Sequence, residues 1–138
     1  MQKIEHLGIA VKDLAAAEET YSKLFKSPPY KRESVEREGV NTSFFRVGAS
    51  KIELLEATKP DSAIAKFIEK RGEGLHHVAF EVIDIRAEMA RLKSEGFTVL
   101  SDEPMDGADD KLVAFVHPKD GHGLLIELCQ SKPQGANS

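Results

Sequence analysis

The chain has little of several features that mark specialised classes of protein. Its single cysteine, Cys129, excludes an internal disulfide and suits a reducing compartment. No apolar run approaches the roughly 20 residues of a membrane helix, and residues 1–5 enter a predicted strand without the apolar core of a signal peptide. The net charge of −4 gives no reason to expect binding to nucleic acid or to an anionic membrane. These absences predict a cytoplasmic protein.

The sequence also lacks the glycine-rich loops that bind nucleotide phosphates. Its 41% hydrophobic and 30% charged residues are typical of a globular protein, and 138 residues suffice for one domain. We therefore predict a single domain over residues 1–138. Its last residues, 132–138, are predicted to form a disordered tail.

What the chain does contain is an internal repeat. Residues 5–11 (EHLGIAV) correspond to residues 76–82 (HHVAFEV) at an offset of 71 positions, which pairs His6 with His77. A repeat constrains the architecture before any single residue is weighed. Each copy also ends in a predicted strand that carries one acid. The same offset relates Val11 to Val82 and Asp13 to Asp84, and the acids of the two final strands are Glu53 and Glu127.

The predicted elements follow the order β-α-β-β-β twice, in modules over about 4–57 and 74–130, joined by a helix over 61–71. Asp13 and Asp84 are good N-caps for the helix of each module, because a short carboxylate accepts from the free amides of a first turn. Links of hairpin length indicate antiparallel strand pairing and hence an α+β fold. The other predicted strands are 40–47, 51–56, 98–100, 112–117 and 123–128.

Strand alternation places two histidines and two glutamates away from the apolar faces of their strands. His6 lies on the strand face opposite Leu7 and Ile9. It shares its face with the small residues Gly8 and Ala10, as in the floor of a cavity. Two imidazole nitrogens and two carboxylate oxygens suit one divalent ion per chain, such as Co, Zn, Mn or Ni. The predicted metal ligands are His6, Glu53, His77 and Glu127.

Each ligand taken alone has a structural interpretation. A lone histidine is usually a packed or surface residue, and a glutamate between aliphatic residues usually faces solvent. Four such residues at equivalent points of two repeats favour the metal site, because the structural interpretation then requires two coincidences. Other residues that could bind a ligand lack such a repeated pattern. His76 is interpreted as packed or capped, Cys129 as a small apolar residue, His117 and His122 as turn residues, and 31–38 as a solvated loop or edge.

These residues resemble the vicinal oxygen chelate superfamily and, within it, the methylmalonyl-CoA epimerase family. The resemblance runs from Ile4 to about Gln130, through stretches such as HLGIAV (6–11), GLHHVAF (74–80) and the HPK run that begins at His117. It implies two βαβββ modules forming a curled, cup-like mixed sheet around a metal, usually in a homodimer. The four metal ligands named above match that family's positions.

The activity implied by the resemblance is inversion at C2 of methylmalonyl-CoA, through an enolate stabilised by a divalent cation. Glu127 resembles the family's metal-bound base. Some epimerases carry a second acid where this chain has Thr42, so the group that returns the proton is open between water and Glu53, the latter only if it leaves the metal.

Other members of the superfamily offer alternative functions. Lactoylglutathione lyase shares the ligand set, but the double histidine and the HPK run favour the epimerase. An extradiol dioxygenase would use two histidines and one glutamate on iron, which leaves Glu53 unexplained. A metal-free antibiotic-binding protein would need aromatic platforms, and this chain has no Trp and two Tyr.

Overall fold

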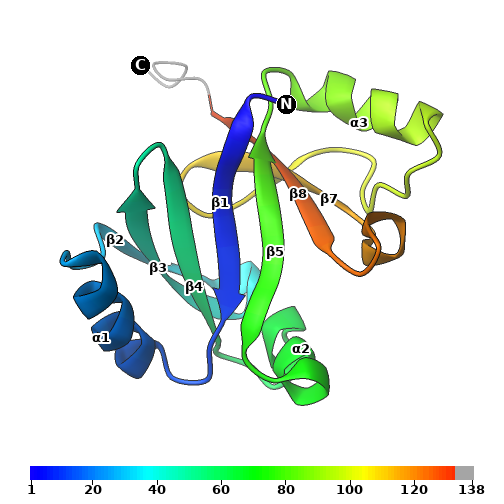
Figure 1. Ribbon diagram of the computed structural model, residues 1–138. Coiled ribbons are helices and arrows are strands. Elements are labelled where there is room, and N and C mark those ends of the chain that lie inside the picture. The colour runs from blue at the N-terminus through cyan, green and yellow to red at the C-terminus, as the bar shows by residue number, and fades with distance from the viewer. Residues whose placement is uncertain (133–138) are drawn as a thin grey trace. The chain divides into compact units, whose positions relative to one another are not determined.

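Three α-helices and eight strands make up the part of the chain that the computed structural model describes, residues 1–132 (Figure 1). All but the first residue of the predicted tail lie outside the described residues. The helices are α1 (Leu14–Phe25), α2 (Ala63–Arg71) and α3 (Ile85–Ser94). The strands are β1 (Lys3–Ala10), β2 (Lys31–Val35), β3 (Val40–Val47), β4 (Ser50–Ala57), β5 (Gly74–Glu81), β6 (Met105–Asp106), β7 (Lys111–Val116) and β8 (Leu125–Ser131).

The order β-α-β-β-β occurs twice with α2 between, as the repeat predicts. The described residues divide into two compact units: an N-terminal unit, Glu5–His77, and a C-terminal unit, which consists of Met1–Ile4 and the described residues from Val78 onward. The boundaries fall inside β1 and β5, so both strands contribute to both units. None of the helices within residues 1–132 is long and apolar enough to cross a membrane.

In the N-terminal unit the strand order is β2-β3-β4-β1-β5. Strand β3 pairs antiparallel with both β2 and β4, whereas β1 pairs parallel with β4. In the C-terminal unit β7 pairs antiparallel with β6 and with β8. This mixture of antiparallel and parallel pairing confirms the predicted α+β class.

Helix α1 covers the face of the N-terminal strands that the alternation marks as apolar. Ile9, Val11 and Leu54 pack there against Leu14 and Tyr21 of α1. On the opposite strand face, a second cluster joins the sheet to α2, with its buried members Ala10, Val40, Leu55 and Ile64. By strand alternation, His6 and Glu53 lie on this second face. They are therefore on the side of their strands that α1 does not cover.

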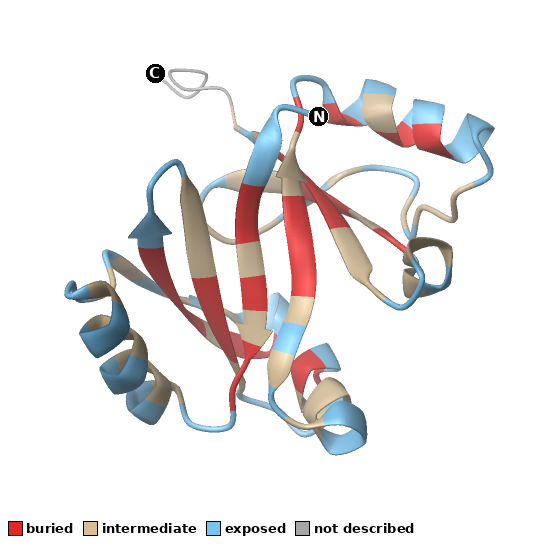
Figure 2. Ribbon diagram, in the orientation of Figure 1, coloured by how far each residue is buried: buried red, intermediate tan, exposed pale blue. Residues whose placement is uncertain are grey.

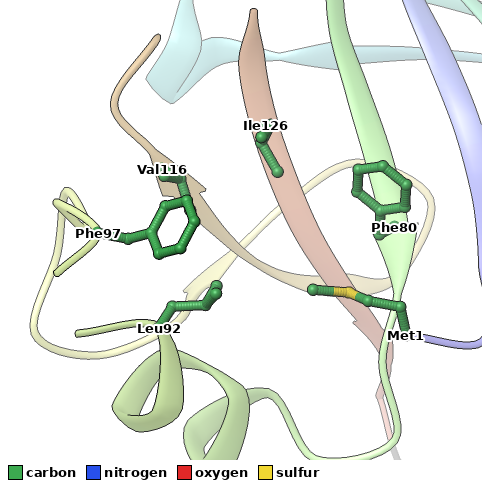
Figure 3. Close-up of a pocket in the computed structure, with 6 residues that line it drawn as sticks. All are labelled: Met1, Phe80, Leu92, Phe97, Val116 and Ile126. Carbon is green, nitrogen blue, oxygen red and sulfur yellow. The ribbon is translucent and has the colours of Figure 1, made fainter. Parts of the chain in front are cut away.

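Helix α3 covers the equivalent face in the C-terminal unit. Ile85, Met89 and Leu92 of the helix are buried against Val116 and Leu128 of the strands. A pocket beside this cluster is lined only by apolar side chains (Figure 3), those of Met1, Phe80, Leu92, Phe97, Val116 and Ile126. With no ionisable or hydrogen-bonding side chain in its lining, this pocket has no group for acid–base or metal chemistry.

Both predicted N-caps are confirmed. The Asp13 carboxylate accepts from the amide of Ala16 and the Asp84 carboxylate from that of Ala87, each at 3.1 Å. Such a bond satisfies one of the amides that an α-helix leaves without an internal partner at its first turn.

Replacing Asp84 by alanine tests this cap. We expect Asp84→Ala to lower the free energy of unfolding by about 1 kcal/mol, because the amide of Ala87 loses its partner at the start of the helix that carries Ile85. Urea denaturation followed by circular dichroism measures the change. The exposed Asp102 is the control, since Asp102→Ala should change stability by less than about 0.5 kcal/mol. Equal effects of both changes would contradict the capping role.

Three local features differ from the prediction or refine it. The run 31–38 contains the edge strand β2 followed by a 3-10 turn, Glu36–Glu38, so the edge interpretation is the right one. The strand predicted over 98–100 is wrong: only a single bridge, Val99 to Val116, forms there. The amide of Thr98 donates instead to the carboxylate of Asp120 at 2.7 Å, which removes it from any strand ladder. The short strand β6 was not predicted.

Candidate metal centre

Three of the four predicted ligands converge in the N-terminal unit. His6 on β1 and His77 on β5 come from neighbouring strands (Figure 1), and their Nε2 atoms lie 3.1 Å apart. Glu53 on β4 places its Oε1 3.3 Å from Nε2 of His6 and 3.6 Å from Nε2 of His77. All three residues are buried, with exposed fractions of 4–6%. Figure 2 shows the buried stretches of β1 and β5 that carry the two histidines.

Strand register brings these three side chains together. Strand β1 lies between β4 and β5, and Glu53 is the register partner of Gly8, two residues beyond His6 on the same face. The His77 ring occupies the space above Gly8, where an added Cβ would collide with Cε1 of the ring. The absence of a side chain at Gly8 therefore makes room for His77 to reach His6.

The donor set and its spacing fit a divalent transition metal. A tetrahedral ion with metal–nitrogen bonds of about 2.0–2.1 Å holds its ligand atoms ~3.3 Å apart. The three donor–donor distances, 3.1, 3.3 and 3.6 Å, bracket that value. Two buried imidazole Nε2 atoms that face each other beside a buried carboxylate are also the borderline donors that Zn²⁺ and Co²⁺ prefer. His6, Glu53 and His77 therefore suit a divalent transition-metal ion.

Glu5 and Lys51 adjoin His6 on the side away from His77. Nδ1 of His6 donates to Oε1 of Glu5 at 2.7 Å, and Nζ of Lys51 lies 2.6 Å from Oε2 of the same carboxylate. Burial of Glu5 opposes its ionisation, but the hydrogen bonds from His6 and Lys51 outweigh burial and lower its pKa to about 2. Glu5 is thus a buried carboxylate that binds a histidine and a lysine together. It was not predicted from the sequence.

His76 is packed, as the sequence predicts. Its ring meets the ring of Phe67 on α2 edge-on, with centroids 4.9 Å apart, and its Nδ1 lies 2.9 Å from Nδ1 of His77. Burial, with a smaller effect from the neighbouring His77, lowers the pKa of His76 to about 4. The imidazole of His76 is therefore neutral at pH 7.

Glu127, the fourth predicted ligand, belongs to the C-terminal unit. It lies on β8 opposite Phe115 of β7 and is 5% exposed. Ile126 and Leu128 on either side of it pack in the cluster under α3, whereas Cys129 shares its parity and packs among apolar residues on the other face. The predicted orientation of Glu127, away from the helix-covered face, agrees with this packing. The burial of Cys129 also agrees with its interpretation as a small apolar residue.

The remaining candidates have structural roles. Nδ1 of His117 accepts from the amide of Lys119 at the start of a 3-10 turn, Pro118–Gly121, and His122 ends that turn with a φ of 58°. Both histidines are exposed. Thr42, at the position of the second acid of some epimerases, is 1% exposed, and its hydroxyl donates to the carbonyl of Glu33 at 3.0 Å.

A methyl group at Gly8 should disturb the site directly. We expect Gly8→Ala to cost about 1–3 kcal/mol of stability and to weaken metal binding, because the new Cβ displaces the His77 ring. Chemical denaturation and titration with Zn²⁺ measure the two effects.

The matched control is a double-mutant cycle with His77. In the double variant Gly8→Ala/His77→Ala the ring is absent, so the stability loss should be smaller than the sum of the two single losses. Strict additivity would show that the methyl group acts elsewhere.

The site and the fold can now be compared with known proteins. A family model described as the Glyoxalase/Bleomycin resistance protein/Dioxygenase superfamily matches residues 5–115. The chain belongs to this superfamily, as the resemblance in its sequence predicts.

Within the superfamily, the similar proteins include methylmalonyl-CoA epimerases. The ethylmalonyl-CoA/methylmalonyl-CoA epimerase of Cereibacter sphaeroides is 42% identical over 130 residues, which cover 93% of this chain and 97% of the relative. A solved methylmalonyl-CoA epimerase in complex with methylmalonyl-CoA and NH4⁺ is 39% identical, with a TM-score of 0.91 and 95% of each chain covered. A Streptomyces coelicolor methylmalonyl-CoA epimerase variant in complex with 2-nitronate-propionyl-CoA matches with the same identity, TM-score and coverage.

Proposed function

We propose that this protein is a methylmalonyl-CoA epimerase, an isomerase that inverts C2 of an acyl-CoA thioester. The observation that carries the proposal is the 42% identity to an ethylmalonyl-CoA/methylmalonyl-CoA epimerase over nearly the full length of both chains. The buried donors of His6, Glu53 and His77 support it, because the reaction creates negative charge that a cation bound there would stabilise.

The metal site of the proposal has His6, Glu53 and His77 as ligands from the N-terminal unit and Glu127 as the fourth. Glu127 is included because it occupies the position of Glu53 in the second repeat and is equally buried. A bound divalent cation would act as a Lewis acid toward the oxygens of the substrate, worth several kcal/mol in typical cases. The identity of the ion is open among Co, Zn, Mn and Ni.

Proton transfer is assigned to Glu127. The C2 proton lies between a carboxylate and a thioester carbonyl, so it is acidic for a C–H, and a positioned carboxylate can remove it with an advantage of about 10²–10⁴-fold. Return of the proton to the opposite face requires a second donor. Thr42 is not that donor in this proposal, since its hydroxyl already donates to the carbonyl of Glu33. The two candidates are water and Glu53, the latter only if its carboxylate leaves the metal.

The substrate class of the proposal is a coenzyme A thioester, which the solved relatives with methylmalonyl-CoA and 2-nitronate-propionyl-CoA support. The homodimer and the cytoplasmic location stay predictions.

Proton NMR of methylmalonyl-CoA in D₂O tests the proposal. With metal-loaded protein we expect the C2 proton signal to disappear and the methyl doublet to collapse, and a chelator should stop both changes. A chiral assay then distinguishes inversion from exchange alone. Absence of exchange with Co²⁺, Mn²⁺, Ni²⁺ and Zn²⁺ would contradict the proposal, and the glutathione hemithioacetal of methylglyoxal would be the next substrate to assay.

A further inference from the structure

The residue that precedes each histidine ligand contacts that ligand at the same atom. Glu5 and His76 are equivalent in the repeat, at the same offset of 71 positions that relates His6 to His77. Oε1 of Glu5 lies 2.7 Å from Nδ1 of His6, and Nδ1 of His76 lies 2.9 Å from Nδ1 of His77. Two chemically different side chains thus make one kind of contact in both halves of the chain.

The tautomer of each histidine decides which of its ring nitrogens is available to a metal, and a contact at Nδ1 bears on that tautomer. A neutral imidazole has one N–H and one lone pair, and the proton can lie on either nitrogen. The Nε2 atoms of His6 and His77 face each other and Glu53, so a cation between them requires lone pairs on both Nε2 atoms. Both protons must then lie on Nδ1. A hydrogen-bond acceptor next to Nδ1 stabilises the proton there and so favours this tautomer.

We propose that Glu5 and His76 are positioning residues that accept the Nδ1–H of His6 and His77 and so present both Nε2 lone pairs to the metal. The inference rests on the proposed metal site. It assigns to His76 the opposite tautomer from His77, with its own proton on Nε2, because its Nδ1 must offer a lone pair. Outer contacts of this kind commonly orient metal-binding histidines.

Each of the two positioning residues is itself held in place. Nζ of Lys51 lies 2.6 Å from the second oxygen of Glu5, and the Lys51 side chain is only 11% exposed. The His76 ring is fixed edge-on against Phe67, at an interplanar angle of 81°. Neither acceptor therefore needs to be ordered when the metal binds. In this proposal, His6 and His77 already carry their protons on Nδ1 before the metal arrives.

The two contacts should differ in strength. The acceptor in Glu5 is a carboxylate oxygen, and the second oxygen of that carboxylate lies 2.6 Å from the ammonium nitrogen of Lys51; a hydrogen bond to such a charged acceptor is roughly twice as strong as one between neutral groups. The acceptor in His76 is an uncharged ring nitrogen. Loss of the Glu5 contact should therefore weaken metal binding more than loss of the His76 contact.

Zn²⁺ affinity of the full-length protein, measured by competition with a chromophoric chelator, tests the inference. Glu5→Ala and His76→Phe remove the acceptors, and we expect each to weaken Zn²⁺ binding by about 10–100-fold, with the larger loss for Glu5. Glu5→Gln and His76→Asn keep an amide oxygen as acceptor and should recover part of the affinity. Glu56→Gln is the matched control, because Glu56 is a carboxylate of β4 that accepts from the amide of Leu14 and should leave Zn²⁺ affinity unchanged.

Nitrogen-15 NMR of the histidine rings separates positioning from a merely structural role. In the Zn²⁺-loaded wild type, His6 and His77 should both carry a slowly exchanging proton on Nδ1, and His76 should carry its proton on Nε2. The Nδ1–H signal of His6 should exchange fast in Glu5→Ala, and that of His77 in His76→Phe.

If the wild type binds Zn²⁺ and both Glu5→Ala and His76→Phe bind it with unchanged affinity, the positioning role is overturned. The proposed function would be left intact by that result. A proton on Nδ1 of His76 in the loaded wild type would overturn it as well. A wild type that bound no divalent cation would contradict the metal site itself and this inference with it.

Discussion

Glu127→Gln should reduce turnover of methylmalonyl-CoA by about 10²–10⁴-fold while the protein keeps part of its metal affinity. The amide has nearly the shape of the carboxylate and retains an oxygen that can bind a cation, but it cannot accept the C2 proton. Because Glu127 is buried on β8, the neutral replacement should be tolerated by the fold. The loss of the C2 proton signal in D₂O measures turnover, and elemental analysis measures bound metal.

Two comparison variants make this result specific. Glu103→Gln changes an exposed carboxylate that pairs with Arg86 and should leave exchange unaffected. Glu53→Gln distinguishes the two candidates for proton return: exchange with lost inversion would assign that step to Glu53, and intact inversion would assign it to water. Near-normal exchange in Glu127→Gln would remove Glu127 from the role of base.

His77→Ala should abolish metal binding and activity together. His77 provides an Nε2 atom 3.1 Å from that of His6, and its loss leaves the N-terminal unit with one imidazole and one carboxylate at the site. The loss of affinity should exceed the roughly 10–100-fold expected for an outer contact such as that of His76. Titration with Zn²⁺ and the D₂O exchange assay measure both effects on the same sample.

The control for His77→Ala lies on the same strand. Leu75 is half exposed on β5, and Leu75→Ala should change neither metal content nor exchange. Stoichiometric metal in His77→Ala would contradict the ligand assignment. An intact metal content with lost activity would instead indicate that His77 acts on the substrate.

Much of the fold follows from local patterns along the chain. Asp13 and Asp84 were recognisable as caps because an N-cap is a property of one turn and its preceding residue. The faces of β1 and β4 were predictable because side chains alternate along a strand. The strand over 98–100 could not be excluded in the same way, since the competing acceptor, Asp120, lies 22 residues away in sequence.

The candidate site was predictable to the extent that it repeats. Two histidines and two glutamates at equivalent positions are visible in one sequence, whereas no pattern in the sequence distinguishes Glu5. Its contact with Lys51 depends on the parallel pairing of β1 with β4, which no local pattern encodes. The sequence shows a glycine at position 8 but not why a side chain is excluded there. The reason is the ring of His77, which belongs to a strand more than 60 residues further along the chain.

By itself, the sequence determined the order of the elements apart from the short strand β6, together with the helix caps, the faces of the strands and the candidate ligands. Each of these depends on neighbours within a few residues or on the repeat. Only the tertiary structure decided how β1, β4 and β5 lie side by side, and hence that Nε2 of His6, Nε2 of His77 and Oε1 of Glu53 come within 3.1–3.6 Å. It also decided the acceptors at Nδ1. Distances between side chains on different strands depend on register and packing, which are set by the whole sheet at once.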